Sequence, residues 1–332
     1  MVMEAPKPKF ETLPPPPGVI GSLKAGFDAV TMHLTVILLP LALDLLLWLG
    51  PHLSLEQLFK PVLADFQQMG ASSGFSASDL SQALEIYKSG LHQFNLLAIL
   101  RTFPIGISSL MSGLQPLTTP LGAVTIVQVN SFISMFGWMA LLTSLGWLGG
   151  GIYFRWVAST VSPEGQPVRG DAVLQAFLLS VLWMIASFVI GTPVFIVIYI
   201  LFAINAVLGQ GAILFLGFLS MWLVVPLFFS AHGIFMRRQN ALLSISSSLQ
   251  LTRFTLPSSS LFVLSVLLIS IGLNYVWSIP PADSWMSLVG IFGHAFISTA
   301  LLTASFIYYR DTTAWLQIMF ERLKAGTTTP QA

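Results

Sequence analysis

The sequence predicts an all-α membrane protein with six transmembrane helices. Of its 332 residues, 55% are hydrophobic and only 8% are charged, whereas a soluble domain carries about 25% charged residues. The mean hydropathy of +0.82 also places the chain in the membrane class. Several apolar runs reach the roughly 20 residues that a helix needs to cross about 30 Å of hydrocarbon. Barrel strands would be about ten residues long and alternate in polarity, so a barrel is excluded.

The N-terminal stretch differs in character from the rest of the chain. Residues 1–20 contain Lys7, Lys9 and a run of four prolines, and they lack the apolar core of a signal peptide. We therefore expect residues 1–20 to form a disordered, Pro-rich cytoplasmic tail. Residues 21–320 should form the membrane domain, with an extracytoplasmic helical insertion at 51–130. Residues 321–332 should form a flexible C-terminal tail.

Six segments satisfy the length and polarity expected of a span. Since backbone polar groups cannot bond to water inside lipid, each of them should be a helix. The predicted spans are 29–49, 131–158, a stretch within 174–207, 212–235, 256–277 and 285–308.

Basic residues set the predicted orientation, because Lys and Arg concentrate in cytoplasmic segments. With the N-terminus inside, the outer segments hold only Lys60, Lys88 and Arg101, all in the long insertion. The other 11 of the 14 basic residues then lie inside. We therefore expect a multi-pass protein of the cell inner membrane with cytoplasmic N- and C-termini.

A short stretch of mixed character precedes each odd-numbered span. These stretches are 21–33, 169–180 and 240–254, and apolar residues recur in them every three or four positions, as on one face of a helix. Such helices are expected to lie in the inner interface of the membrane. The sequence thus predicts three helical hairpins, each preceded by an interfacial amphipathic helix.

The third repeat carries a family resemblance. Its Ser-rich stretch ends in Thr252 and Arg253, and the last span closes with Tyr308, Tyr309, Arg310 and Asp311. With the opening GSLKAGFDAV, this arrangement resembles the membrane domain of bacterial glycerophosphoryl diester phosphodiesterases and related six-helix membrane families. The long outer insertion departs from that pattern. No His, Glu and Asp set for metal-assisted phosphodiester cleavage is visible, so the resemblance does not imply enzyme activity.

The outer insertion contains two amphipathic stretches, at 53–69 and 78–89. They are expected to be helices that either cap the bundle or dock a partner, or that rest on the outer leaflet.

Asp44 is the only acid well inside a predicted span, and such residues are functional candidates by default. The alternative is that Asp44 reaches the outer headgroups or pairs with a base such as Arg101. His232 and His294 lie in the fourth and sixth spans without the further ligands that a metal site needs. We therefore expect no metal and no cofactor.

Four arginines lie at the inner ends of spans, where they either fix the topology or bind anionic lipid headgroups. They are Arg155, Arg237, Arg238 and Arg310. Gly146 and Gly150 have the four-residue separation that permits close helix approach. Their predicted role is packing within the chain or self-association.

These observations predict a non-enzymatic membrane protein that acts as a scaffold or accessory subunit in contact with lipid. No catalytic constellation is visible, and the net charge of +1 argues against nucleic acid as a partner. Other membrane subunits are the expected partners besides lipid. The alternative is a transporter or permease component with a midplane cavity lined by residues such as Asp44, Asn205 and Gln210.

Overall fold

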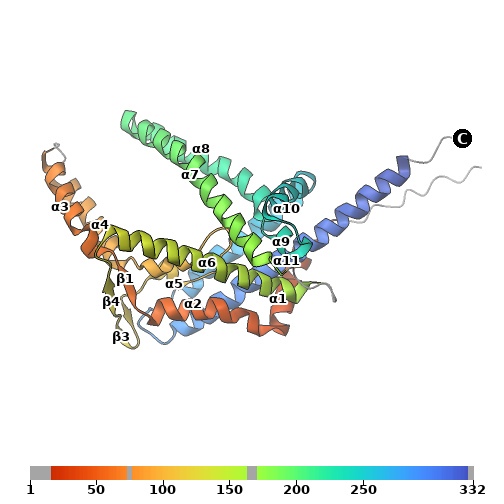
Figure 1. Ribbon diagram of the computed structural model, residues 1–332, viewed down its shortest axis with the longest axis horizontal. Helices are drawn as coiled ribbons and strands as arrows, with labels where there is room; N and C mark the ends of the chain where they lie inside the picture. Colours follow the sequence, from red (N-terminus) through yellow and green to blue (C-terminus); the bar gives the residue numbers. More distant parts are fainter. Residues whose placement is uncertain (1–15, 73–76, 163–169, 328–332) are drawn as a thin grey trace, which may run out of the picture.

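The computed structural model describes residues 16–72, 77–162 and 170–327 (Figure 1). The first helices are α1 (Val19–Met32), the 3-10 helix η1 (Leu34–Ile37) and α2 (Leu38–Leu49). The outer insertion contains β1 (His52–Ser54), α3 (Glu56–Ser72), α4 (Ala77–Gln93), η2 (Leu96–Leu100), α5 (Met111–Leu114), β2 (Thr118–Thr119), β3 (Gly122–Ala123) and β4 (Ile126–Gln128). The remaining helices are α6 (Phe132–Val161), α7 (Ala172–Ile204), α8 (Ala206–Phe228), α9 (His232–Arg237), α10 (Ala241–Trp277) and α11 (Ser287–Thr327).

The predicted all-α membrane fold is confirmed. Within the described residues, five helical segments are long and apolar enough to cross a membrane, and a sixth arises if the bent pair at the N-terminus counts as one span. The second predicted span corresponds to α6, whose N-cap Ser131 accepts a hydrogen bond from the backbone of Ser134. The fourth predicted span begins earlier than expected, because α8 starts at Ala206. It is also interrupted, since α8 ends at Phe228 and α9 begins at His232.

The first predicted span, 29–49, is wrong at its start. The chain bends by 96° between α1 and the segment Leu34–Leu49. The backbone of His33 is non-helical there, and η1 precedes Pro40 in the first turn of α2. The 12-residue α2 is only about 18 Å long. The first predicted span is therefore not one straight helix, and α1 is a separate helix, as the interfacial pattern predicts.

The other two predicted interfacial stretches do not form separate helices. The stretch 169–180 starts outside the described residues. From Ala172 it becomes the first turns of α7, because neither Gly nor Pro occurs between Ala172 and Gly191. The stretch 240–254 is the first part of α10, which continues through a kink. Thr255 leaves the helical region there, two residues before Pro257, whose ring clashes with the preceding turn of a helix.

The last helix is much longer than the predicted span 285–308. α11 has 41 residues and runs to Thr327, into the stretch 321–332 that the sequence assigns to a flexible tail. Good helix formers such as Leu316, Gln317 and Glu321 continue the helix beyond the apolar run. The predicted tail 1–20 lies mostly outside the described residues, and α1 already begins at Val19.

The outer insertion is only partly helical. α3 and α4 form the predicted pair, with Phe66 and Tyr87 in edge-on ring contact, and the pair projects away from the bundle (Figure 1). The short strands were not predicted from the sequence. β1 pairs in parallel with β4, which brings His52 opposite Ile126 and ties the two ends of the insertion together. β2 and β3 form a small antiparallel hairpin.

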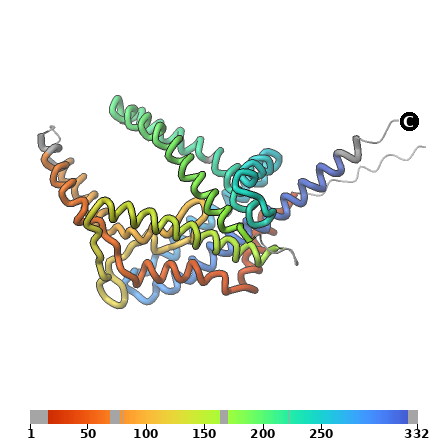
Figure 2. The backbone as a smooth tube through the Cα atoms, viewed as in Figure 1, coloured from red at the N-terminus to blue at the C-terminus, as the bar shows by residue number. Residues whose placement is uncertain are grey.

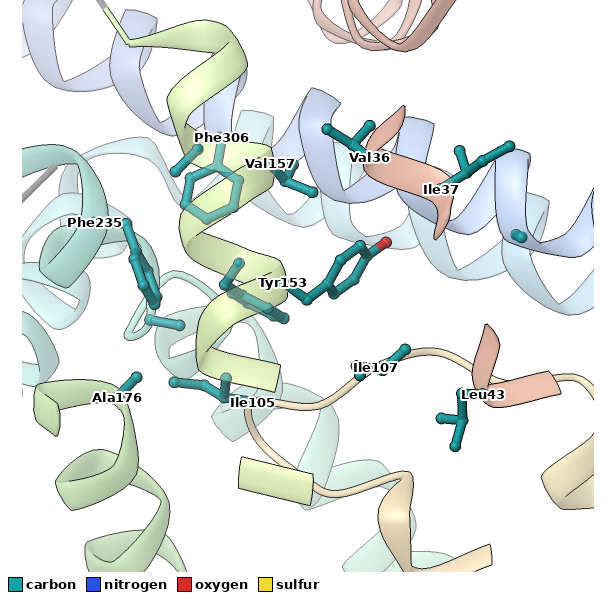
Figure 3. Close-up of a cluster of buried hydrophobic side chains, with 14 of the residues drawn as sticks. Val36, Ile37, Leu43, Ile105, Ile107, Tyr153, Val157, Ala176, Phe235 and Phe306 are labelled. Carbon is teal, nitrogen blue, oxygen red and sulfur yellow. The ribbon is translucent and has the colours of Figure 1, made fainter. Parts of the chain in front are cut away.

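A segment of this insertion dips into the bundle. We call residues 102–111 the buried loop; Ile105, Ile107, Leu110 and Met111 in it are all buried in the main hydrophobic core. Figure 3 shows Ile105 and Ile107 on this loop near Tyr153 of α6, with Leu43 of α2 beyond them. The loop therefore fills the space that the short α2 leaves within the bundle.

The helices α7 and α8 diverge from this body as an extended hairpin (Figures 1 and 2). Only the start of α7 is buried, where Gly151 of α6 packs against Val173. In the most apolar 18-residue stretch of α7 no residue is buried. In the corresponding stretch of the span Ala206–Arg237, which contains α8, 6% of the residues are buried. The structure thus has two parts, a compact body and a projecting α7–α8 hairpin.

Candidate functional site

Asp44 anchors the buried loop. Its side chain is completely buried on α2. Oδ1 accepts hydrogen bonds from the hydroxyl of Ser109 at 2.5 Å and from the backbone N–H of Met111 at 2.9 Å, and Oδ2 accepts one from the N–H of Leu110 at 3.2 Å. Bonds to a carboxylate are the strong ones, and here they satisfy the backbone donors at the start of α5.

His294 of α11 completes this site. Its Nδ1 lies 3.4 Å from Oδ2 of Asp44, and the imidazole is 13% exposed. Asp44 does not pair with Arg101, whose guanidinium instead donates to the hydroxyl of Ser112. The carboxylate thus ties α2 to the buried loop by hydrogen bonds and contacts α11 at His294, whose Nδ1 makes no hydrogen bond. This arrangement supports a structural role for Asp44.

A line of polar side chains continues from His294 along α11. Ser298 accepts a hydrogen bond from Ser108 of the buried loop, Thr299 bonds to Tyr153 of α6, and Ser305 bonds to Nε2 of His232. Each of these bonds ties α11 to a different part of the chain. This line was not predicted from the sequence, although the recurrence of polar residues within an apolar run was the available signal.

The buried loop packs against Gly146 and Gly150 of α6. A Cβ added to Gly146 would lie 2.7 Å from the carbonyl oxygen of Leu100, and one added to Gly150 would lie 2.6 Å from Cα of Gly106. Contacts this close are possible only without a side chain. The chain itself occupies this face of α6, and self-association through Gly146 and Gly150 stays a prediction.

Arg310 caps the end of another helix. Its guanidinium donates to the carbonyl oxygen of Val161, the last residue of α6, at 2.9 Å and to Oδ1 of Asp311 at 2.8 Å. A cation at this position satisfies an orphan carbonyl and complements the negative end of the helix dipole. Arg155 is exposed on α6, and Arg238, also exposed, ends α9 in a left-handed conformation with φ of 54°. Arg237, the remaining predicted arginine, lines a cavity.

That cavity lies between α10 and α11 and has a volume of about 190 Å³. Its polar wall consists of Arg237, Ser247, Gln250, Tyr309, Thr313 and Gln317. Its apolar wall consists of Leu251, Phe254, Leu316 and Phe320. Except for Arg237, none of these residues was a predicted site residue, because the wall forms only where α11 continues beyond the predicted span.

His232 lies in an aromatic setting and not in a cluster of metal ligands. The rings of Phe228, Phe229, Phe306 and Tyr309 surround its imidazole. In the part of the chain that the structure describes, no three His, Cys, Asp or Glu side chains lie close enough to hold a metal ion.

The residues of the predicted transport cavity do not meet. Asn205 caps α8 by accepting a hydrogen bond from the backbone of Val207 at 2.7 Å, and both Asn205 and Gln210 are exposed at the tip of the α7–α8 hairpin. Asp44 faces the buried loop instead. Comparisons of the chain with protein families, with curated proteins and with solved structures find no match.

Proposed function

We propose that this multi-pass membrane protein is a non-enzymatic scaffold or accessory subunit that presents the α7–α8 hairpin to lipid and to another membrane protein. The observation that carries the proposal is the hairpin itself, which is apolar on all sides and almost uncovered by the rest of the chain. A helix that is hydrophobic all round belongs inside a bilayer or a larger assembly.

The compact body supports this reading because its polar groups serve the fold. Asp44 holds the buried loop and Arg310 caps α6. Such contacts stabilise one arrangement of helices and leave few polar groups for a reaction. A transporter is the weaker alternative, since Asp44, Asn205 and Gln210 do not face one space.

The hairpin also offers positions where another helix can approach closely. A Cβ added at Gly191, Gly211 or Gly217 would meet no atom within 4 Å. Helix association in membranes depends on packing at small residues, because lipid provides no hydrophobic driving force. We expect the partner to contribute a transmembrane helix to this surface. We also propose that the chain is related to the membrane domain of bacterial glycerophosphoryl diester phosphodiesterases. This relation does not imply a substrate for the chain.

Photo-crosslinking in native membranes tests the proposal. A photoreactive amino acid would replace Phe195 of α7 or Phe215 of α8, which are 69% and 65% exposed. Ile152 of α6, which is 52% exposed, is the matched control position. We expect a discrete protein adduct from the hairpin positions and none from the control. Lipid adducts alone at all three positions would overturn the accessory-subunit role.

A further inference from the structure

We infer that the cavity between α10 and α11 binds the phosphate of one anionic phospholipid, with an acyl chain lying along its apolar wall. This inference rests on the lipid contact of the proposed function. It deepens that function by naming the lipid class that one site binds.

The charge of the cavity favours an anion. Arg237 is a lining residue, and neither Asp nor Glu is among the residues that line the cavity. The Arg237 side chain lies near the hydroxyl of Tyr309, which Ser247 and Thr313 also approach. A guanidinium matches the oxygens of a phosphate, to which it can donate two parallel hydrogen bonds.

The other wall of the cavity is suited to hydrocarbon. Leu251 and Leu316 lie on facing helices, and the rings of Phe254 and Phe320 meet edge to face with centroids 5.2 Å apart. A lining that combines a guanidinium with four apolar side chains suits a phospholipid at the membrane surface, where phosphate and hydrocarbon meet. Free phosphate would gain nothing from the apolar wall.

Size and position agree with a headgroup. The volume of about 190 Å³ exceeds the roughly 150 Å³ that holds a benzene molecule in a protein core, and it is below the roughly 300 Å³ of a typical ligand pocket. The cavity therefore accepts a phosphate group but not a whole lipid. Its lining comes from the end of α9, from α10 before its kink, and from α11 beyond the apolar run. The predicted orientation places these parts at the inner surface, where anionic lipids attract basic residues.

Lipid retention of the purified full chain tests the inference. Native mass spectrometry would compare dioleoylphosphatidylglycerol with dioleoylphosphatidylcholine and with inorganic phosphate. We expect the wild-type chain to retain one phosphatidylglycerol and to unfold at a higher temperature in its presence. Arg237→Gln should weaken this binding about tenfold or more, because a bond to a charged group is lost. Thr313→Val should weaken it less.

The control variant is Arg253→Gln, which removes an exposed arginine of α10 that does not line the cavity. It should bind phosphatidylglycerol as the wild type does. Equal loss in Arg253→Gln and Arg237→Gln would overturn the site in favour of general charge attraction. An equal shift with inorganic phosphate would overturn the lipid as its source. Unchanged binding by a folded Arg237→Gln chain would also overturn the inference, and none of these outcomes bears on crosslinking of the α7–α8 hairpin.

Discussion

The carboxylate of Asp44 accepts a hydrogen bond at 2.9 Å from the backbone N–H of Met111, which lies 67 positions later in the chain. This bond joins a helix of the body to a loop that enters the body from the outer insertion. The acid within this apolar segment therefore has a structural explanation. The buried loop carries backbone N–H donors, and burying them without a hydrogen-bond acceptor would cost free energy that the carboxylate of Asp44 avoids.

Replacing Asp44 should loosen the loop. In Asp44→Asn one carboxylate oxygen becomes an amide donor that faces the N–H or hydroxyl donors of Ser109, Leu110 and Met111. We expect a loss of about 1.5–3 kcal/mol of stability, measured as a lower unfolding temperature in detergent and as faster proteolysis of the insertion. Asp28→Asn changes an exposed acid of α1 and should behave as the wild type. Identical behaviour of both variants would exclude the anchoring role.

Gly26 should be intolerant of any side chain. An added Cβ would lie 2.6 Å from Cβ of Ala304 and 2.6 Å from the carbonyl oxygen of Ala300, so α1 would have to move off α11. Overpacking of this kind costs about 1–3 kcal/mol, and the unfolding temperature of Gly26→Leu should fall. Gly21→Leu lies on the same helix with open space around it. It should be neutral or slightly stabilising, since Leu is a better helix former than Gly.

The glycines of α6 allow the two predicted roles to be separated. Gly150→Leu would clash with Gly106 of the buried loop, whereas a Cβ added at Gly137 would meet no atom within 4 Å. We expect Gly150→Leu to lower the unfolding temperature and Gly137→Leu to leave it unchanged. Light scattering of the purified chain reports the oligomeric state. A Gly150→Leu chain that keeps its stability but loses a dimer would favour self-association over packing within the chain.

His52 should make the outer insertion sensitive to acid. Burial lowers the pKa of His52 from its usual value of 6.5, and neither ring nitrogen has a hydrogen-bond partner. Above about pH 6.5 the imidazole is neutral in the folded and unfolded states alike, so its ionisation costs nothing. As the pH falls below this value, the unfolded state takes up the proton first and the folded state loses stability.

The measurement is the unfolding temperature of wild type and His52→Phe between pH 7.5 and pH 5.5. The wild type should lose more stability than the variant across this range. His92→Gln is the control, because it removes an exposed imidazole of the same insertion, which contacts Glu56. A wild type and His52→Phe with the same pH profile would show that this imidazole does not contribute.

The sequence predicts the helices well where apolar length decides them. α6 matches its predicted span within a few residues, and the predicted boundary before residue 256 coincides with the kink at Thr255, because Pro257 is a local signal. The buried loop was not predictable in this way. Its place depends on Asp44 and Gly150, which are distant in sequence from Met111 and Gly106, and no local pattern records such pairings.

The candidate site was predictable only in part. Arg237 was visible as a base at the end of a span, but Tyr309 and Thr313 join it only because α11 continues past the apolar run. Apolar content predicts where a helix must lie in lipid and does not predict where a helix ends in water. The cavity-lining residues of α11 could therefore not be predicted from the sequence.

The packing of α1 and the buried loop against α11 has a consequence for how the chain is made. α11 leaves the ribosome long after α1 and α2, and it supplies Ala304 to α1 and His294 to the site of Asp44. These two helices must therefore wait for α11 before they can take their final positions. The body is assembled only once α11 has been made, and a chain cut before α11 should be a substrate for membrane quality-control proteases.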